Sequence, residues 1–234
     1  MRRGQVIALG GGGFSTDPDD PTLDDYVLAQ ADRDHPRVGF LPTASGDAPD
    51  YVQRFHAGFA GRCAASHLRL FSPPSAEPER WIAAQDVIYV GGGSTANLLA
   101  VWRVHGVDRL LAAAHDRGAV LCGISAGAMC WFEAGITDSF GPLAPLHDGL
   151  GILAGSCTPH YDGEAERRPA LHRALAEGLP AGYAIDDGAA AHFVDRRLHQ
   201  CVTSRRNAAV HWVEHAQGRV REQRLGTTAL VASY

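Results

Sequence analysis

Short apolar runs rich in β-branched residues alternate with amphipathic stretches, and this alternation limits the possible folds more than any other feature of the chain. Strands are predicted at residues 5–9, 38–41, 67–71, 86–90 and 119–124. Helices are predicted to begin near Thr22 and Tyr51, and two more are expected around Trp81 and residues 97–99. Such alternation is typical of βαβ units around a mainly parallel sheet flanked by helices. The sequence therefore predicts an α/β fold.

The C-terminal third has a different pattern. Short strand candidates separated by turn residues lie at 183–185, 190–194, 198–202, 209–213 and 220–225. They are predicted to be antiparallel strands that extend or cap the same sheet. The chain shows no internal repeat, low-complexity tract or linker, and 234 residues suit one domain with a full core. We expect a single domain over residues 1–234.

Composition excludes several classes of protein. Hydrophobic residues make up 45% of the chain and charged residues 20%, the balance of a globular enzyme. The formal net charge of −5 argues against nucleic acid or an anionic membrane surface as a partner. No segment approaches the roughly 18 apolar residues of a membrane span. Without a recognisable secretion signal, the expected compartment is the cytoplasm, and a homodimer is one expected assembly. The five scattered cysteines suit reduced, buried thiols.

The strongest local motif is G-I-S-A-G at residues 123–127, between a buried strand and a predicted helix. A G-x-S-x-G segment in this context is typical of a nucleophile elbow, where the serine occupies a sharp turn and neighbouring side chains would collide with backbone. The helix that follows directs free N–H groups toward the reacting centre. Ser125 is therefore the predicted nucleophile. The alternative is a tight strand–helix turn with an incidental serine.

A serine nucleophile needs a base, and His160 has the most informative context among the twelve histidines. Pro159 stiffens the backbone before it, and Asp162 and Glu164 follow closely. His192, within a predicted strand, is the main rival, although a structural role is the more common one for such a residue. His160 is the predicted general base.

Two glycine runs raise the question of nucleotide binding. Residues 10–13 lack the third glycine of G-x-G-x-x-G, and the looser match that begins at Gly91 has no acidic residue at the end of the next strand. Residues 91–93 are better explained as an oxyanion-hole loop or as a plain strand–helix turn. No metal-binding spacing is present, so neither a metal nor another cofactor is expected. Residues 186–188 (D-D-G) could bind a cation, but a turn explains them more simply.

Three segments together resemble a known family: residues 89–95 (Y-V-G-G-G-S-T), 123–128 (G-I-S-A-G-A) and 158–161 (T-P-H-Y). In this order and spacing they look like peptidase E, the serine peptidase family that includes the cyanophycinases. Residues 41–45 (L-P-T-A-S) extend the resemblance, which spans roughly residues 5–187.

The resemblance implies a flavodoxin-like fold similar to class I glutamine amidotransferases, with serine in place of cysteine at the elbow. It also implies Ser125 as nucleophile, His160 as base, and the N–H groups of Gly92 and Ala126 as the oxyanion hole. Peptidase E cleaves dipeptides with N-terminal aspartate, so a small peptide, with Asp-X dipeptides first, is the expected substrate.

The segment after His160 departs from the aspartyl dipeptidases. It is short, and it carries acidic residues where the third triad member and part of the substrate pocket would fall. Arg167 or Arg168 could bind a substrate carboxylate, although a solvated helix start is the favoured role. Substrate choice is thus less constrained than reaction type. A small-molecule esterase or amidase and a non-catalytic binding protein of the same fold stay open as alternatives.

The third triad member must be a carboxylate that accepts the Nδ1–H of the base. Asp162 is predicted first and Glu164 second, because both lie within a few residues of His160 on one loop. Asp138 ranks third, since it follows the elbow in the order Ser, acid, His used by α/β-hydrolases. Its alternative role is that of a helix-capping or turn residue.

Overall fold

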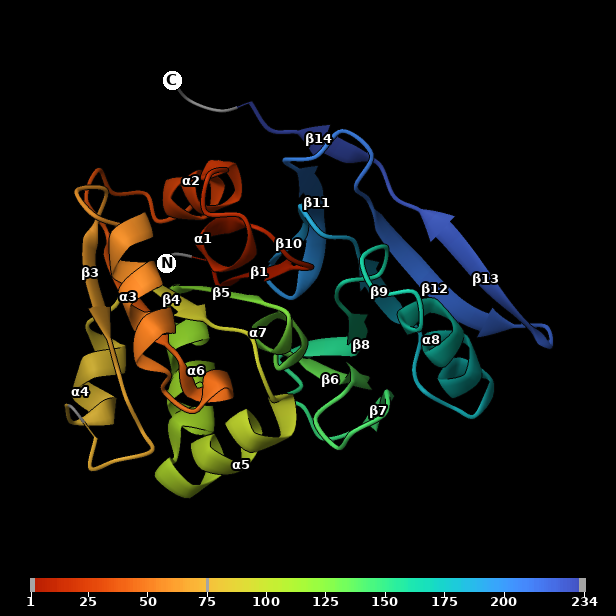
Figure 1. The fold of residues 1–234 in the computed structure, drawn as a ribbon, viewed down its shortest axis with the longest axis horizontal. Coiled ribbons are helices and arrows are strands. Elements are labelled where there is room, and N and C mark those ends of the chain that lie inside the picture. The colour runs from red at the N-terminus through yellow and green to blue at the C-terminus, as the bar shows by residue number, and fades with distance from the viewer. Residues whose placement is uncertain (1–2, 75, 232–234) are drawn as a thin grey trace.

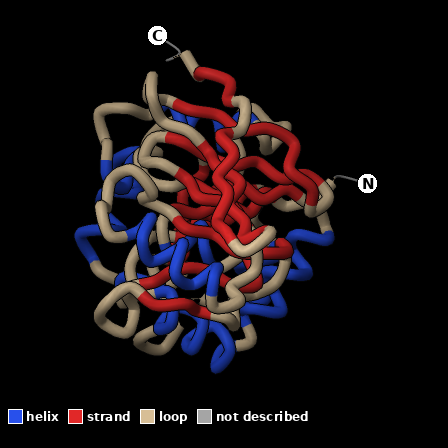
Figure 2. Tube along the Cα trace, turned by 90° about the vertical axis from the view of Figure 1, so that its right-hand side faces the viewer, coloured by secondary structure: helices blue, strands red, loops and turns tan. Residues whose placement is uncertain are grey.

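The computed structural model describes residues 3–74 and 76–231, whose strands form two sheets (Figure 1). The first sheet has the order β14 (Thr227–Ala229), β11 (Arg197–Thr203), β10 (Ala189–Val194), β1 (Gln5–Leu9), β5 (Val120–Ile124), β4 (Val87–Val90), β2 (Arg37–Leu41) and β3 (Ala64–His67). The second has the order β13 (Arg219–Arg224), β12 (Val210–Ala216), β9 (Gly182–Ile185), β8 (Leu153–Thr158), β6 (Phe132–Thr137) and β7 (Ala144–Leu146). In the view turned by 90°, the strands run through the middle of the molecule (Figure 2).

The helices are α1 (Gly13–Thr16), α2 (Thr22–Ala29), α3 (Pro49–Gly58), α4 (Pro78–Ala83), α5 (Thr95–His105), α6 (Val107–Asp116), α7 (Ala126–Met129) and α8 (Arg167–Ala176), with a 3₁₀ turn at Thr43–Ser45. Local sequence explains several ends. The Ser94 hydroxyl caps α5 by accepting from the Asn97 N–H at 3.3 Å. Gly106, in the left-handed conformation with φ of 68°, ends α5 and allows α6 to begin at the next residue.

Helices cover both faces of the first sheet because successive residues of a strand point to opposite sides. In β1, Val6 and Ala8 join the core that contains Leu98 and Trp102 of α5. Ile7 and Leu9 face the other way, into a core with the side chains of α2 and α3. The strands β1, β5, β4, β2 and β3 pair in parallel, as the strand–helix alternation predicted. The α/β fold with a mainly parallel sheet is confirmed.

The C-terminal third divides between the two sheets, which corrects the prediction that it extends a single sheet. Strands β10 and β11 add antiparallel strands to the first sheet beside β1. Strands β9, β12 and β13 instead belong to the second sheet, where β6 and β8 precede them. Helix α8 packs on this second sheet through a separate apolar cluster that includes Leu171, Leu175 and Val213 (Figure 1).

The strand predicted at residues 67–71 is also misplaced: β3 ends at His67. Leu68 and Leu70 are buried, but residues 68–70 adopt no regular structure. The carboxylate of Asp47 accepts the N–H groups of Leu70 and Phe71, so these two amides bond to a side chain instead of a neighbouring strand. All five cysteines are buried, as predicted. Among the described residues, no helix has the length and apolar character that a membrane span needs.

Candidate active site

Ser125 lies on the turn between β5 and α7 with φ of 57° and ψ of −116°. These angles, unusual for a residue other than glycine, match the first central position of a type II′ turn. The flanking glycines explain how the turn closes. A Cβ atom on Gly123 would lie 2.2 Å from the carbonyl oxygen of Gly127, and one on Gly127 would lie 2.3 Å from that of Val90. The sequence therefore folds into the strained elbow that the G-x-S-x-G motif predicted.

His160 follows β8, also with a positive φ of 53°, and the Tyr161 N–H ties the loop to the Ile185 carbonyl at 3.2 Å. His160 and Ser125 line one cavity of about 350 Å³. The structure thus brings the predicted nucleophile and the predicted base to the same cavity.

The carboxylate at the imidazole is that of Asp187, whose Oδ1 lies 2.6 Å from His160 Nδ1. Both side chains are largely shielded, with 17% of the His160 side chain and 26% of that of Asp187 exposed. The hydrogen bond from His160 lowers the pKa of Asp187, which keeps this carboxylate ionised. An ionised acceptor at Nδ1 favours the tautomer in which Nε2 has no proton, the form a general base requires.

The prediction that Asp162 binds the imidazole is wrong. Its Oδ1 instead accepts the backbone N–H of Asp187 at 2.8 Å, so Asp162 holds in place the residue whose carboxylate contacts His160. Glu164 forms an ion pair with Arg167 at 2.7 Å. Asp138 is exposed in a neighbouring cavity, and no described contact joins it to His160.

Asp187 lies 27 positions after His160 along the chain, so no local motif marks it as the partner of the imidazole. The two residues meet because β8 and β9 are parallel neighbours whose carboxyl ends share one edge. The available signal was the D-D-G segment directly after a predicted strand, which was interpreted as a turn. The preceding acid, Asp186, does not bind the imidazole, because its carboxylate accepts the Ala209 N–H at 2.9 Å. Burial and the nearby charge of Asp162 raise the pKa of Asp186 to about 6.

Glycines make room for the Asp187 carboxylate. A Cβ atom on Gly11 would lie 2.0 Å from Oδ1, and one on Gly163 would lie 2.5 Å from Oδ2. Gly11 and Asp187 also form a β-bridge, and the Gly188 N–H donates to the Gly11 carbonyl at 2.9 Å. The first glycine run therefore packs against the acid and supports no nucleotide-binding interpretation.

The two predicted oxyanion-hole donors have different surroundings in the structure. Ala126 begins α7 directly after Ser125, and its N–H has no hydrogen-bond partner in the described part of the chain. The Gly92 N–H donates to the hydroxyl of Tyr51 at 3.0 Å, so it does not point at an unoccupied position. Gly92 nevertheless packs against the nucleophile, because a Cβ atom there would lie 3.3 Å from that of Ser125.

Ser125 lines two cavities, which contain different charged residues. The cavity shared with His160 also contains Arg54, whose guanidinium lies 5.0 Å from the Tyr51 ring centroid. A second cavity of about 350 Å³ contains Asp138, Glu164 and Arg167.

Helix α8 begins at Arg167, as the favoured role of the arginine pair predicted, but the Arg167 side chain is not solvated. The residue is only 3% exposed and donates to the Ile136 carbonyl as well as to Glu164. Arg168 is the solvated member of the pair, 53% exposed at its side chain, and lies over the ring of Tyr161.

The rival base His192 lies away from this site. Its ring bonds to the Tyr26 hydroxyl at 2.6 Å and to the side-chain amide oxygen (Oε1) of Gln5 at 2.8 Å. Burial lowers the pKa of His192 to about 4, so it stays neutral.

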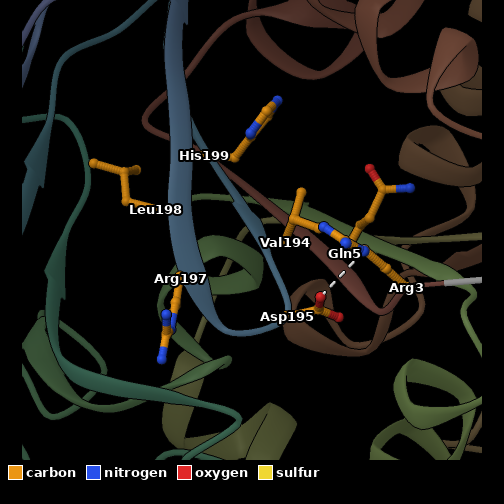
Figure 3. A pocket seen from close by; sticks show the side chains of 7 residues that line it. All are labelled: Arg3, Gln5, Val194, Asp195, Arg197, Leu198 and His199. Atoms are coloured by element: carbon orange, nitrogen blue, oxygen red, sulfur yellow. Dashed lines mark ion pairs between the residues drawn. The ribbon is translucent and has the colours of Figure 1, made fainter.

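A cavity of about 720 Å³, shown in Figure 3, is also remote from Ser125. It includes Gln5 at the start of β1, whereas Ser125 follows the far end of the neighbouring strand. Among residues 3–74 and 76–231, no cluster of His, Cys, Asp or Glu could hold a metal ion.

The fold and the site define a hydrolase of the α/β class, and comparison with known proteins agrees. The model of peptidase family S51 matches residues 6–201. The uncharacterized peptidase YgaJ of Bacillus subtilis (strain 168) is 52% identical over 220 residues, which cover 93% of this chain and 95% of YgaJ. The chain belongs to peptidase family S51.

Solved structures share the fold at low sequence identity. The crystal structure of a peptidase from an acI-B1 Actinobacterium superposes with a TM-score of 0.73 at 18% identity, covering 99% of this chain and 97% of the other. The structure of a putative peptidase E protein from Listeria monocytogenes EGD-e gives a TM-score of 0.63 at 17% identity, covering 96% of this chain and all of the other. The resemblance to peptidase E and the flavodoxin-like fold are therefore confirmed.

Proposed function

We propose that this peptidase hydrolyses dipeptides or short peptides through a triad of Ser125, His160 and Asp187. The observation that carries the proposal is the 2.6 Å contact between His160 Nδ1 and Asp187 Oδ1, at a cavity that also contains Ser125 on its strained turn. Nucleophile, base and orienting acid are the three parts that an acyl-transfer mechanism requires.

In the proposed mechanism, His160 Nε2 takes the hydroxyl proton as Ser125 Oγ attacks the peptide carbonyl. The N–H of Ala126 donates to the oxyanion that forms. His160 then gives its proton to the leaving amine, and the C–N bond breaks to leave an acyl-enzyme. Water activated by the same histidine hydrolyses the ester and regenerates Ser125. Asp187 holds the tautomer throughout and stabilises the imidazolium.

Dipeptides with N-terminal aspartate are the first substrates to test. The motif resemblance and the Listeria peptidase E neighbour favour them. The Arg54 guanidinium, in the same cavity as Ser125, supplies a cation for a substrate carboxylate. A small-molecule esterase or amidase would use the same triad on a different carbonyl compound, and a binding protein of this fold would lack turnover altogether.

A fluorophosphonate probe followed by peptide mapping tests the proposal directly. We expect stable labelling of Ser125 in the wild type and none in Ser125→Ala, which should keep its fold and lose on the order of 10⁴-fold or more in kcat. A panel of Asp-X dipeptides, other short peptides and simple esters then assigns the substrate class. An unlabelled wild type or near-native turnover by Ser125→Ala would contradict the serine mechanism, and turnover of esters alone would reject the peptidase assignment.

A further inference from the structure

Tyr51 stands beside the nucleophile in a position that the proposed mechanism leaves unused. Tyr51 is 6% exposed, and its ring packs against Phe14 and Phe40 at centroid distances of 5.7 and 5.2 Å. It lines the cavity of Ser125 and His160. The ring is thus held firmly at the wall of the cavity that contains Ser125.

Two described contacts hold the Tyr51 hydroxyl. It accepts the Gly92 N–H at 3.0 Å, and its oxygen lies 2.5 Å from the hydroxyl oxygen of Ser15. A phenol oxygen has two lone pairs and one proton to donate. When Ser15 donates, the two lone pairs of Tyr51 are filled and its proton is available to a third partner.

That third partner would lie on the side of residues 91–93 that faces Ser125. A Cβ atom on Gly92 would lie 3.3 Å from the Cβ of Ser125 and 3.9 Å from its Oγ. Tyr51, Gly92 and Ser125 line the same cavity, in which a carbonyl attacked by Oγ would develop its negative charge. Burial raises the pKa of Tyr51, so the phenol keeps its proton at neutral pH and remains a donor.

We propose that the Tyr51 hydroxyl donates a hydrogen bond to the oxyanion, as the second donor beside the Ala126 N–H. The inference rests on the proposed serine mechanism. The Gly92 N–H then acts through Tyr51, since a hydrogen bond into the phenol oxygen makes its proton a stronger donor. The proton stays on Tyr51 throughout, and the negative charge returns to the carbonyl when the C–N bond breaks.

The test compares the wild type with Tyr51→Phe and with a matched control, Tyr26→Phe. The Tyr26 hydroxyl is also hydrogen bonded, to His192 and Gln200, but outside the active site. Removing one oxyanion donor typically lowers kcat by about 10²–10³-fold. We expect a loss of that size in Tyr51→Phe, with KM within about threefold of wild type. The affinity for a peptide aldehyde, which forms a tetrahedral adduct with the serine, should fall by a similar factor. Tyr26→Phe should keep both.

Each contrary result has a distinct meaning. If Tyr51→Phe keeps or raises kcat, the freed Gly92 N–H is the donor and the inference is wrong. A change in KM alone would likewise reject it. Ser15→Ala keeps the phenol, so its kcat should fall clearly less than that of Tyr51→Phe. An equal fall in kcat would mean that the packing of the loop around Gly92, and not the phenol proton, supports turnover, and the inference would be wrong. Failure of the fluorophosphonate to label wild-type Ser125 would instead overturn the serine mechanism itself.

Discussion

Replacing Asp187 with alanine should lower kcat by about 10⁴-fold. The charge-assisted hydrogen bond at 2.6 Å between two mostly shielded groups is worth about 1.5–3 kcal/mol, which corresponds to roughly 10–150-fold. The rest of the loss comes from the tautomer of His160, because without the acceptor the proton on Nδ1 is no longer favoured. Initial rates on the best substrate of the dipeptide and ester panel, together with the rate of fluorophosphonate labelling, measure the effect.

Asp162→Asn is the matched control, since it also removes a carboxylate near His160. Its amide oxygen can still accept the Asp187 N–H, so we expect less than about tenfold loss in kcat. Asp162→Ala lacks the acceptor and should lose more. The reverse ranking, with near-native turnover in Asp187→Ala and a loss of about 10³-fold or more in Asp162→Asn, would refute the assignment of Asp187.

Three further predictions concern space, pH and burial. Gly163→Ala places a methyl group 2.5 Å from Asp187 Oδ2 and should lower kcat at least tenfold, whereas Gly226→Ala, with open space around it, should keep wild-type kinetics. Burial raises the pKa of Asp24 from 3.8 to about 6, so the folded state binds more protons there and stability falls as pH rises through that window. Relative to wild type, Asp24→Asn should gain on the order of 3 kcal/mol of unfolding free energy between pH 4 and 7, measured by urea unfolding. Arg167→Met leaves the Ile136 carbonyl without its donor and should cost about 1–3 kcal/mol by the same assay, while the exposed Arg168→Met should cost less than about 1 kcal/mol.

Contrary outcomes are equally specific. Wild-type kinetics in Gly163→Ala would mean that the Asp187 carboxylate can shift without lowering kcat. A pH-independent offset between Asp24→Asn and wild type would show that Asp24 titrates alike in the folded and unfolded states. Equal costs for the two arginine variants would contradict the structural role of the buried one.

Local sequence was enough to place Ser125 on a strand–turn–helix. The elbow around Ser125 depends on Gly123 and Gly127, which lie within two residues of it, and the strand before it is recognisable from a continuous apolar run. The parallel strands of the first sheet were predicted for a similar reason, since strand–helix alternation is visible along the chain.

The division of the C-terminal strands between two sheets was not predictable in this way. Strands β9 and β10 follow each other within a few residues, yet β9 pairs with β8 and β10 pairs with β1. Pairing depends on which neighbour offers a free edge and an apolar face, and neither is written in the strand's own sequence.

The sequence by itself determined the elbow serine and the histidine after β8, because each lies in a short motif with its own backbone requirement. The resemblance of these motifs to a known family indicated the family. Only the tertiary structure showed which carboxylate contacts the imidazole of His160. Asp162, two residues from His160, turns its carboxylate to a backbone N–H, while Asp187, 27 residues away, reaches the imidazole. The physical reason is that parallel strands bring their carboxyl ends together regardless of the length of chain between them, so closeness in sequence does not measure closeness at the site.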